Sequence, residues 1–167
     1  SKNSFVFFER SGIAEAIIYD SSNCNIAVAG RVKMPSLKLY ASLMVLKTII
    51  NYDYLFPKIR NECGAYGASF SFDLFGNIVF NSCNNSFVDK SIDIIMNAPD
   101  YIEKMKLSKS SIENAKIGAL RKFYSPLEPY EVGKKSYENY LMGLDSQVSM
   151  EVQKNIVEAK DSDVRNT

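Results

Sequence analysis

The residues best suited to chemistry in this sequence are Arg60 and Tyr66, which flank a turn. Gly64 and Gly67 break the helical periodicity of the preceding residues and permit backbone conformations that are closed to most residues. The predicted order is helix, tight turn, strand, so a guanidinium and a phenol stand on one rigid unit. Such a pair of donors can hold a carbonyl oxygen or a carboxylate. The alternative is a helix C-cap followed by an ordinary surface arginine and an edge tyrosine.

The absence of histidine excludes several kinds of chemistry. None of the 167 residues is His, so the chain cannot build a zinc site from two imidazoles, nor an ordinary Ser-His or Cys-His nucleophile. A Ser-Lys dyad stays open, although no spacing marks one. The acidic residues lack the spacing of a calcium loop, as at Asp20, Asp53, Glu62, Asp73 and Asp89. We therefore predict no metal site in this chain.

Composition limits the other classes of protein to which the chain can belong. The 167 residues, 46% of them hydrophobic, suit one compact domain over residues 1–167. A formal net charge of +1 gives no electrostatic case for binding nucleic acid. No apolar run approaches the roughly 20 residues that span a bilayer. We therefore predict neither a nucleic acid nor a membrane as a partner.

Cysteine usage bears on the cellular compartment, and the chain ends bear on whether the sequence is part of a longer polypeptide. Cys24, Cys63 and Cys83 are odd in number and widely spaced, which predicts neither a disulfide framework nor a metal knuckle. A reducing compartment is favoured, and secretion is not expected. The start at Ser1 and the polar end at Lys160 to Thr167 suggest a piece of a longer polypeptide.

The first half of the chain has a strand, helix and hairpin pattern. Residues 14–19 and 25–32 are β-type runs separated by a turn, and a helix is expected to start at Pro35 and Ser36. Residues 68–75 alternate serine or aspartate with phenylalanine or leucine, and Gly76-Asn77 leads into a second strand, a hairpin signal. The phenylalanines should face a layer of helices. If this strand lies at the sheet edge, it could add a peptide as an extra strand.

The second half of the chain reads as helical. Ser86 with Asp89 and Ser110 with Glu113 have the spacing of capping boxes, and Pro99 should end or restart a helix. Two further helices are predicted over residues 129–142 and 146–159. The predicted fold class is α+β, with an antiparallel or mixed sheet covered by helices on one face.

The run Ile59-Arg60-Asn61-Glu62-Cys63-Gly64-Ala65-Tyr66-Gly67 resembles the C-terminal region of pitrilysin/insulinase-family zinc metallopeptidases, most closely the presequence-protease and falcilysin branch. In that branch a similar helix ends in an Ile-Arg-x-x-Gly-Gly-Ala-Tyr-Gly-like motif, and Cys63 here replaces the first motif glycine. The resemblance continues through Leu107-Ser108-Lys109 and the Pro126-x-x-Pro129 break, so it covers most of the chain. One departure is Ser82-Cys83-Asn84-Asn85, where the branch usually carries a Tyr-Arg-Asp-Pro-like run.

The resemblance implies a metallohydrolase-like αβ unit (LuxS/MPP-like), the last of four in a longer peptidase chain. It implies that Arg60 and Tyr66 contact bound peptide across a chamber from the zinc, with Gly64, Ala65, Gly67 and Ser69 as further substrate-binding positions. Zinc is expected in the N-terminal half of the full-length protein and none in this chain, which alone should be inactive. The implied partners are that N-terminal half and unfolded peptides.

Two other functions stay open. The chain could belong to a catalytically inactive family member that acts as a structural or assembly subunit, and Cys63 with the altered run 82–85 favours this alternative. A free-standing small-ligand sensor would require a closed internal pocket. The expected location is cytoplasmic in a bacterium, and mitochondrial or in a plastid-type organelle in a eukaryote.

Overall fold

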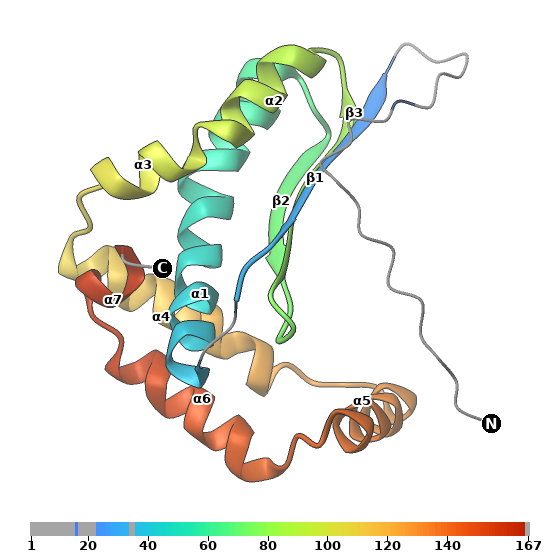
Figure 1. The fold of residues 1–167 in the computed structure, drawn as a ribbon, viewed down its shortest axis with the longest axis vertical. Helices are drawn as coiled ribbons and strands as arrows, with labels where there is room; N and C mark the ends of the chain where they lie inside the picture. The colour runs from blue at the N-terminus through green and yellow to red at the C-terminus, as the bar shows by residue number, and fades with distance from the viewer. Residues whose placement is uncertain (1–15, 17–22, 34–35, 166–167) are drawn as a thin grey trace.

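The sheet is small and antiparallel (Figure 1). The computed structural model describes residues 16, 23–33 and 36–165, so the predicted strand at 14–19 and the helix start at Pro35 lie almost wholly outside the described residues. The described strands are β1 (Cys24–Arg31), β2 (Gly67–Phe72) and β3 (Asn77–Asn85), in the order β1-β3-β2. The predicted hairpin is confirmed as β2 and β3, with Phe70 opposite Phe80.

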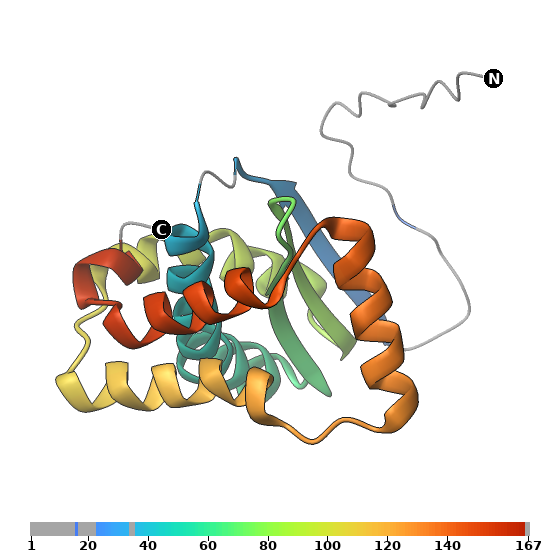
Figure 2. The ribbon, with the colours of Figure 1, turned by 90° about the horizontal axis from the view of Figure 1, so that it is seen from below.

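Helices cover one face of this sheet, as Figure 2 shows from below. This confirms the predicted α+β class. The long helix α1 continues directly into the π-helical segment η1, which packs on β2, and α2 packs on β1 and β3. Their bounds are α1 (Leu37–Ile49), η1 (Ile50–Asn61), α2 (Val88–Met96), α3 (Ala98–Lys104), α4 (Lys109–Tyr124), α5 (Pro129–Met142), α6 (Ser146–Glu158) and α7 (Asp161–Arg165).

The core lies between the sheet and the α1–η1 helix. Tyr54 is 2% exposed, its ring stacks on Tyr101 at 4.5 Å, and its hydroxyl donates to the Ile94 carbonyl at 2.7 Å. Buried Phe70 meets the ring of Phe80 at 4.7 Å from the sheet side. The period-two phenylalanines therefore face the helices, as predicted, and Ser69 on the same strand is exposed.

Helix starts were predicted with mixed success. Ser36 caps α1 by accepting from the Leu39 N–H at 3.2 Å. The Ser110 cap is wrong, because Ser108 performs that function for α4, accepting from Ser111 N–H at 3.0 Å. The Ser86 cap is also wrong: α2 begins after Phe87 without a side-chain cap, and the Ser86 hydroxyl contacts Asn23.

The points where helices restart or end agree with the sequence prediction more closely than the helix caps do. Pro99 lies in the first turn of α3, where its missing N–H costs nothing. Gly143 ends α5 with φ of 65°, the left-handed conformation typical of a C-cap glycine. The last predicted helix is confirmed as α6, which stops one residue earlier at Glu158 and begins after the cap residue Asp145.

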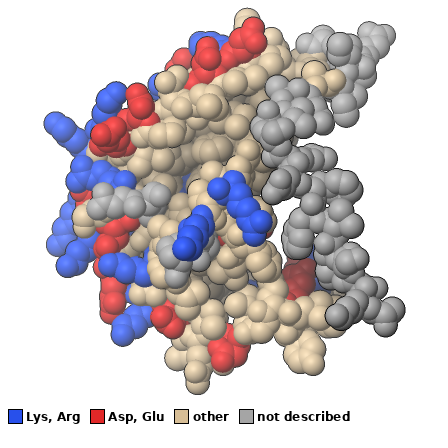
Figure 3. Space-filling model, in the orientation of Figure 1, with Lys and Arg blue, Asp and Glu red and all other residues tan. Residues whose placement is uncertain are grey.

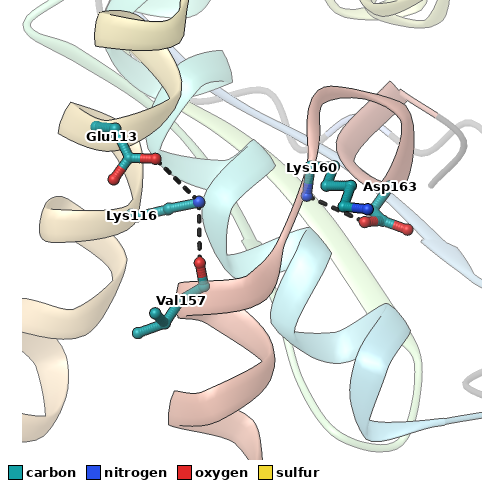
Figure 4. A network of polar contacts seen from close by, with 5 residues as sticks. All are labelled: Glu113, Lys116, Val157, Lys160 and Asp163. Atoms are coloured by element: carbon teal, nitrogen blue, oxygen red, sulfur yellow. Dashed lines mark hydrogen bonds and ion pairs between the residues drawn. The ribbon is translucent and has the colours of Figure 1, made fainter.

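A partly buried lysine connects the outer helices α4 and α6 (Figure 4). The Lys116 ammonium on α4 donates to the Glu113 carboxylate at 3.0 Å and to the Val157 carbonyl on α6 at 2.9 Å. After α6, the Lys160 N–H donates to the Asp163 carboxylate at 3.0 Å, which starts α7. In contrast, α5 has no buried residue and lies beyond the β2–β3 turn (Figure 2).

Candidate functional site

The turn between η1 and β2 is built on one glycine. Gly64 has φ of 66°, in the left-handed region, while Cys63 and Ala65 on either side are buried. The Ala65 N–H reaches back to the Ile59 carbonyl at 3.4 Å. Gly64 is therefore required by the backbone, as predicted.

Gly67 differs from that prediction, because it lies in β2 without a positive φ. A Cβ at this position would meet the Cys83 Sγ at 3.6 Å, an ordinary contact. Tyr66, one residue earlier, donates its N–H to the Cys83 carbonyl at 3.0 Å. The strand pairing with β3 thus begins at Tyr66, and the phenol leaves the sheet from its first paired residue.

Arg60 is exposed on the last turn of η1, and its guanidinium lies over the Phe56 ring at 4.8 Å from the ring centre. Among the residues that the structure describes, no carboxylate pairs with it. The nearby Glu62 is instead engaged by Lys90 of α2 at 3.4 Å. The cation–π contact holds the guanidinium in place and leaves its donors for a ligand.

A groove of about 470 Å³ lies on the sheet face opposite the helices, which we name the open face. All three strands contribute small side chains to it, because alternate residues of each strand point away from the core. Tyr66, 74% exposed, lines the groove. The other lining residues are Asn25, Ile26, Ala27, Gly67, Ala68, Ser69, Asn81, Ser82 and Cys83.

The structure brings some of the predicted site residues together and separates others. Tyr66, Gly67 and Ser69 line the open-face groove. Arg60 does not line it, and Ala65 is only 3% exposed, so its side chain belongs to the core. The expected substrate contacts at these positions stay predictions, and Arg60 and Tyr66 would meet a peptide at different points along it.

One residue at the outer edge of β2, Asn51, was not predicted from the sequence. The Asn51 side-chain amide donates to the Phe70 carbonyl at 3.2 Å and accepts from the Phe70 N–H at 2.6 Å. This side chain fills the place of a neighbouring peptide group, so the edge that was expected to add a substrate strand is closed at its centre. No local sequence signal marks Asn51, because its partner lies 19 positions away along the chain.

A second hollow lies on the helix side of the sheet, between β1, α1, α2 and α3, with a volume of about 540 Å³. Figure 3 shows that the surface over this region is largely uncharged, whereas charged side chains gather along the border by α3 and α7. The lining is mainly aliphatic and aromatic, and includes Val28, Leu43, Ile95 and Ile102. We name it the apolar groove.

The described part of the chain contains neither a cluster of metal-ligating side chains nor a membrane-spanning helix. No group of three or more Cys, Asp or Glu residues there is placed to hold a metal ion. None of the described helices is long and apolar enough to cross a membrane.

Solved structures show which fold the chain shares with known proteins. A Bordetella pertussis protein assigned provisionally as a zinc protease matches with a TM-score of 0.65 and 18% identity, covering 85% of this chain and 83% of that chain. The inactive peptidase domain of a provisionally assigned zinc protease from Bordetella parapertussis matches with a TM-score of 0.63 and 17% identity, covering 90% and 87%. At these identities the likeness shows the fold, which is that of a zinc-protease αβ domain.

Sequence relatives narrow the class to a family. The PreP C-terminal domain model matches residues 14–166, so the chain belongs to that family and the predicted resemblance is confirmed. Protein HypA of Clostridium perfringens is 24% identical over 80% of this chain and 14% of its own length. The mitochondrial presequence protease of Xenopus laevis is 26% identical over 76% of this chain and 12% of its own length. The chain therefore spans only a small part of these relatives.

Proposed function

We propose that this chain is the last of four αβ units in a zinc-dependent endopeptidase that degrades oligopeptides, and that its open face forms part of the chamber wall. The observation that carries the proposal is the groove of small side chains with Tyr66 at its border. A groove lined by small residues lets an extended backbone approach the sheet closely. Membership of the PreP C-terminal domain family supports this assignment.

The proposed roles follow from the chemistry of each side chain. Water attack on a peptide carbonyl develops an oxyanion, and a donor such as the Tyr66 hydroxyl stabilises it by about 3 kcal/mol in a poorly hydrated site. Arg60, which pairs with no carboxylate among the described residues, suits a backbone carbonyl or a terminal carboxylate through its planar fork. The Ser69 hydroxyl and the backbone at Gly64, Ala65 and Gly67 would position the peptide.

The apolar groove supports a second part of the proposal: its occupant is the N-terminal half of the same polypeptide. A mainly apolar hollow of this size, with Lys33, Glu103 and Arg165 as its charged lining residues, is expected to be covered by protein in the assembled molecule. The relatives contain enough additional polypeptide to cover such a groove, since 86% of HypA lies outside the matched 14%. That half would hold the zinc and the general base, and zinc would supply the polarised water there.

The proposed location follows the relatives. Mitochondrial presequence proteases support an organelle, mitochondrial or plastid-type, if the source is eukaryotic. A relative in Clostridium perfringens supports the cytoplasm if the source is bacterial.

The test uses the full-length protein and a quenched fluorescent peptide. We expect Tyr66→Phe and Arg60→Ala each to lower kcat/KM by about 10- to 100-fold without changing the melting temperature, because each removes a donor to the reacting peptide. Tyr137→Phe is the matched control, since Tyr137 is similarly exposed on α5, away from the groove. Unchanged kinetics for both variants would remove the assigned roles.

The second candidate is a structural subunit of a catalytically inactive relative. The likeness to the inactive peptidase domain from Bordetella parapertussis and the replacement of a motif glycine by buried Cys63 favour it. Mixing this chain with the separately produced upstream polypeptide separates the two candidates. A stable complex with Tyr66-dependent cleavage supports the peptidase, whereas a stable complex without cleavage supports the structural subunit.

A further inference from the structure

A small polar cavity of about 220 Å³ lies between α1, η1, α4 and the outer edge of β2. It shares no lining residue with the open-face groove or the apolar groove. Hydrogen-bond donors surround it from two helices: Tyr40, Lys47 and Thr48 from α1, and Lys122 from α4. Nothing in the proposed peptidase function uses this cavity.

Close contact between the two helices builds the cavity. Gly118 of α4 lies against Thr48 of α1, and a Cβ on Gly118 would stand only 2.8 Å from the Thr48 Cγ2. The glycine thereby lets the helix axes approach and brings Lys47 and Lys122 to the same hollow. The adjacent Asn51 amide is held by Phe70, which fixes the wall formed by η1.

Three donors at this cavity have no partner among the residues that the structure describes. Neither Lys47 nor Lys122 forms an ion pair or hydrogen bond there, and the Tyr40 hydroxyl forms no hydrogen bond. The Tyr40 ring is fixed edge-on against Phe72 at 5.2 Å, so its hydroxyl is already positioned. Positioned donors without acceptors are typical of a binding site for an acceptor-rich group.

Among the described residues, no carboxylate forms an ion pair with Lys47 or Lys122, and the neighbouring acids make their contacts elsewhere. Asp73 accepts from the Phe75 N–H at 2.8 Å and from Asn77. Glu131 accepts from the Glu128 N–H at 2.9 Å. Glu138 pairs with Lys134 at 3.9 Å. These three acids and Asp145, which accepts from the Val148 N–H at 2.9 Å, line the adjoining hollow between the β2–β3 turn and α5. That hollow shares Tyr40, Phe72 and Lys122 with the cavity.

Positive side chains lie close to Lys122, whereas Asp73 lies close to Tyr40: burial, and then the charge of Asp73, raise the pKa of the Tyr40 hydroxyl. Burial, and then the charges of Lys47 and Lys135, lower the pKa of Lys122. Repulsion from Lys47 and Lys135 disfavours the charged form of Lys122, and a bound anion would relieve that repulsion.

We propose that this cavity binds an oxyanion, with Lys47 and Lys122 as charged donors and the Tyr40 hydroxyl as the third donor. A carboxylate or a phosphate offers the acceptor geometry that these groups require. The site lies on the helix side of the domain, at the outer edge of β2, so its occupation leaves the open face free.

The experiment measures anion binding to the complete 167-residue chain by isothermal titration calorimetry at low ionic strength. The probes are inorganic phosphate, and N-acetylglycine with N-acetylglycinamide as its uncharged match. Sodium chloride at equal ionic strength controls for screening. We expect saturable binding of phosphate, N-acetylglycine or both, and none of the amide. The responding probe distinguishes a phosphate ligand from a carboxylate ligand.

Variants locate the binding in the cavity. Lys122→Gln and Lys47→Gln should each weaken binding by about tenfold or more, as expected for loss of one charge-assisted hydrogen bond. Tyr40→Phe, which keeps the ring packing, should weaken it several-fold. Lys109→Gln is the control, since Lys109 is exposed at the start of α4 outside the cavity.

Two results would overturn the proposal. One is binding of neither anion above the chloride control. The other is equal affinity in wild type, Lys122→Gln and Tyr40→Phe. Without anion, Lys122→Gln should retain or raise the melting temperature, because the substitution removes like-charge repulsion. If the Lys122→Gln protein does not fold, Lys47→Gln serves as the second variant. This experiment measures anion binding and not peptide cleavage. A result that overturns the anion site therefore leaves the proposed peptidase role untouched.

Discussion

At the scale of single residues, Gly64 and Gly133 form a natural pair for measuring backbone strain. A Cβ at either position would have no atom within 4 Å, so substitution meets no steric neighbour. Gly64 has φ of 66°, whereas Gly133 is inside α5. We expect Gly64→Ala to lower the free energy of unfolding by roughly 1–2 kcal/mol. Gly133→Ala should raise it by about 0.5–1 kcal/mol.

Urea unfolding of the two variants checks this pair. If Gly64→Ala were neutral or stabilising, the left-handed turn between η1 and β2 would not be required. The Gly133 variant shows that the assay detects a change of the opposite sign.

The conformations of Gly64 and Gly143 and the helix start at Ser36 could be predicted because the physics is local. Gly64 and Gly143 need a left-handed backbone that few other residues adopt, so their sequence positions nearly determine their conformation. The cap of α4 was misassigned because Ser108 and Ser110 both offer a hydroxyl near the helix start. Which of them accepts depends on the chain direction before the helix, and the sequence does not encode this locally.

At the scale of elements, the outer edge of β2 depends on η1. Asn51 satisfies both backbone groups of Phe70, and these bonds join residues 19 positions apart. No local pattern predicts this pairing, because it exists only once η1 packs on the sheet. The hairpin, in contrast, was predictable from alternation and Gly76-Asn77.

Asn51→Ala should expose that edge. We expect the free energy of unfolding to fall by about 1–3 kcal/mol, because the Phe70 N–H and C=O lose their partners in a partly buried site. We also expect the variant to self-associate at high concentration, since an unpaired strand edge templates further pairing.

Urea unfolding and sedimentation velocity measure these two effects. Asn97→Ala is the control, because the Asn97 amide makes one exposed bond to the Asp93 carbonyl, and its effect should stay within about 0.5 kcal/mol. A stable, monomeric Asn51→Ala protein would show that the edge needs no closure.

At the scale of the whole molecule, two carboxylates link stability to pH. For Asp73, burial raises the pKa, but hydrogen bonds from Asn77 and Phe75 and the charge of Arg31 outweigh it, so the pKa is lowered. Asp163 receives a hydrogen bond from Lys38 at 2.8 Å and another from the Lys160 N–H, and its pKa is also lowered. Asp73 bridges the turn between β2 and β3 by accepting from the Asn77 amide, and Asp163 connects α7 to α1 through Lys38.

The sign follows from the direction of these shifts. A carboxyl whose pKa is lower in the folded state contributes stability above its unfolded pKa, ordinarily 3.8, and loses that contribution as pH falls through the folded value. Because the chain has no histidine, no imidazole titrates between about pH 5 and 8. We therefore expect the free energy of unfolding to fall below about pH 4, with no histidine-type step near neutrality.

Urea unfolding across a pH series checks this expectation against Asp73→Asn with Asp163→Asn. The double variant should be less stable than wild type at pH 6 and should lose less stability on going to pH 3, because its amides do not titrate. Parallel loss in both proteins would assign the acid sensitivity to other carboxyl groups. A step near pH 6.5 in wild type would contradict the expectation outright, since a chain without imidazole has no ordinary group to produce it.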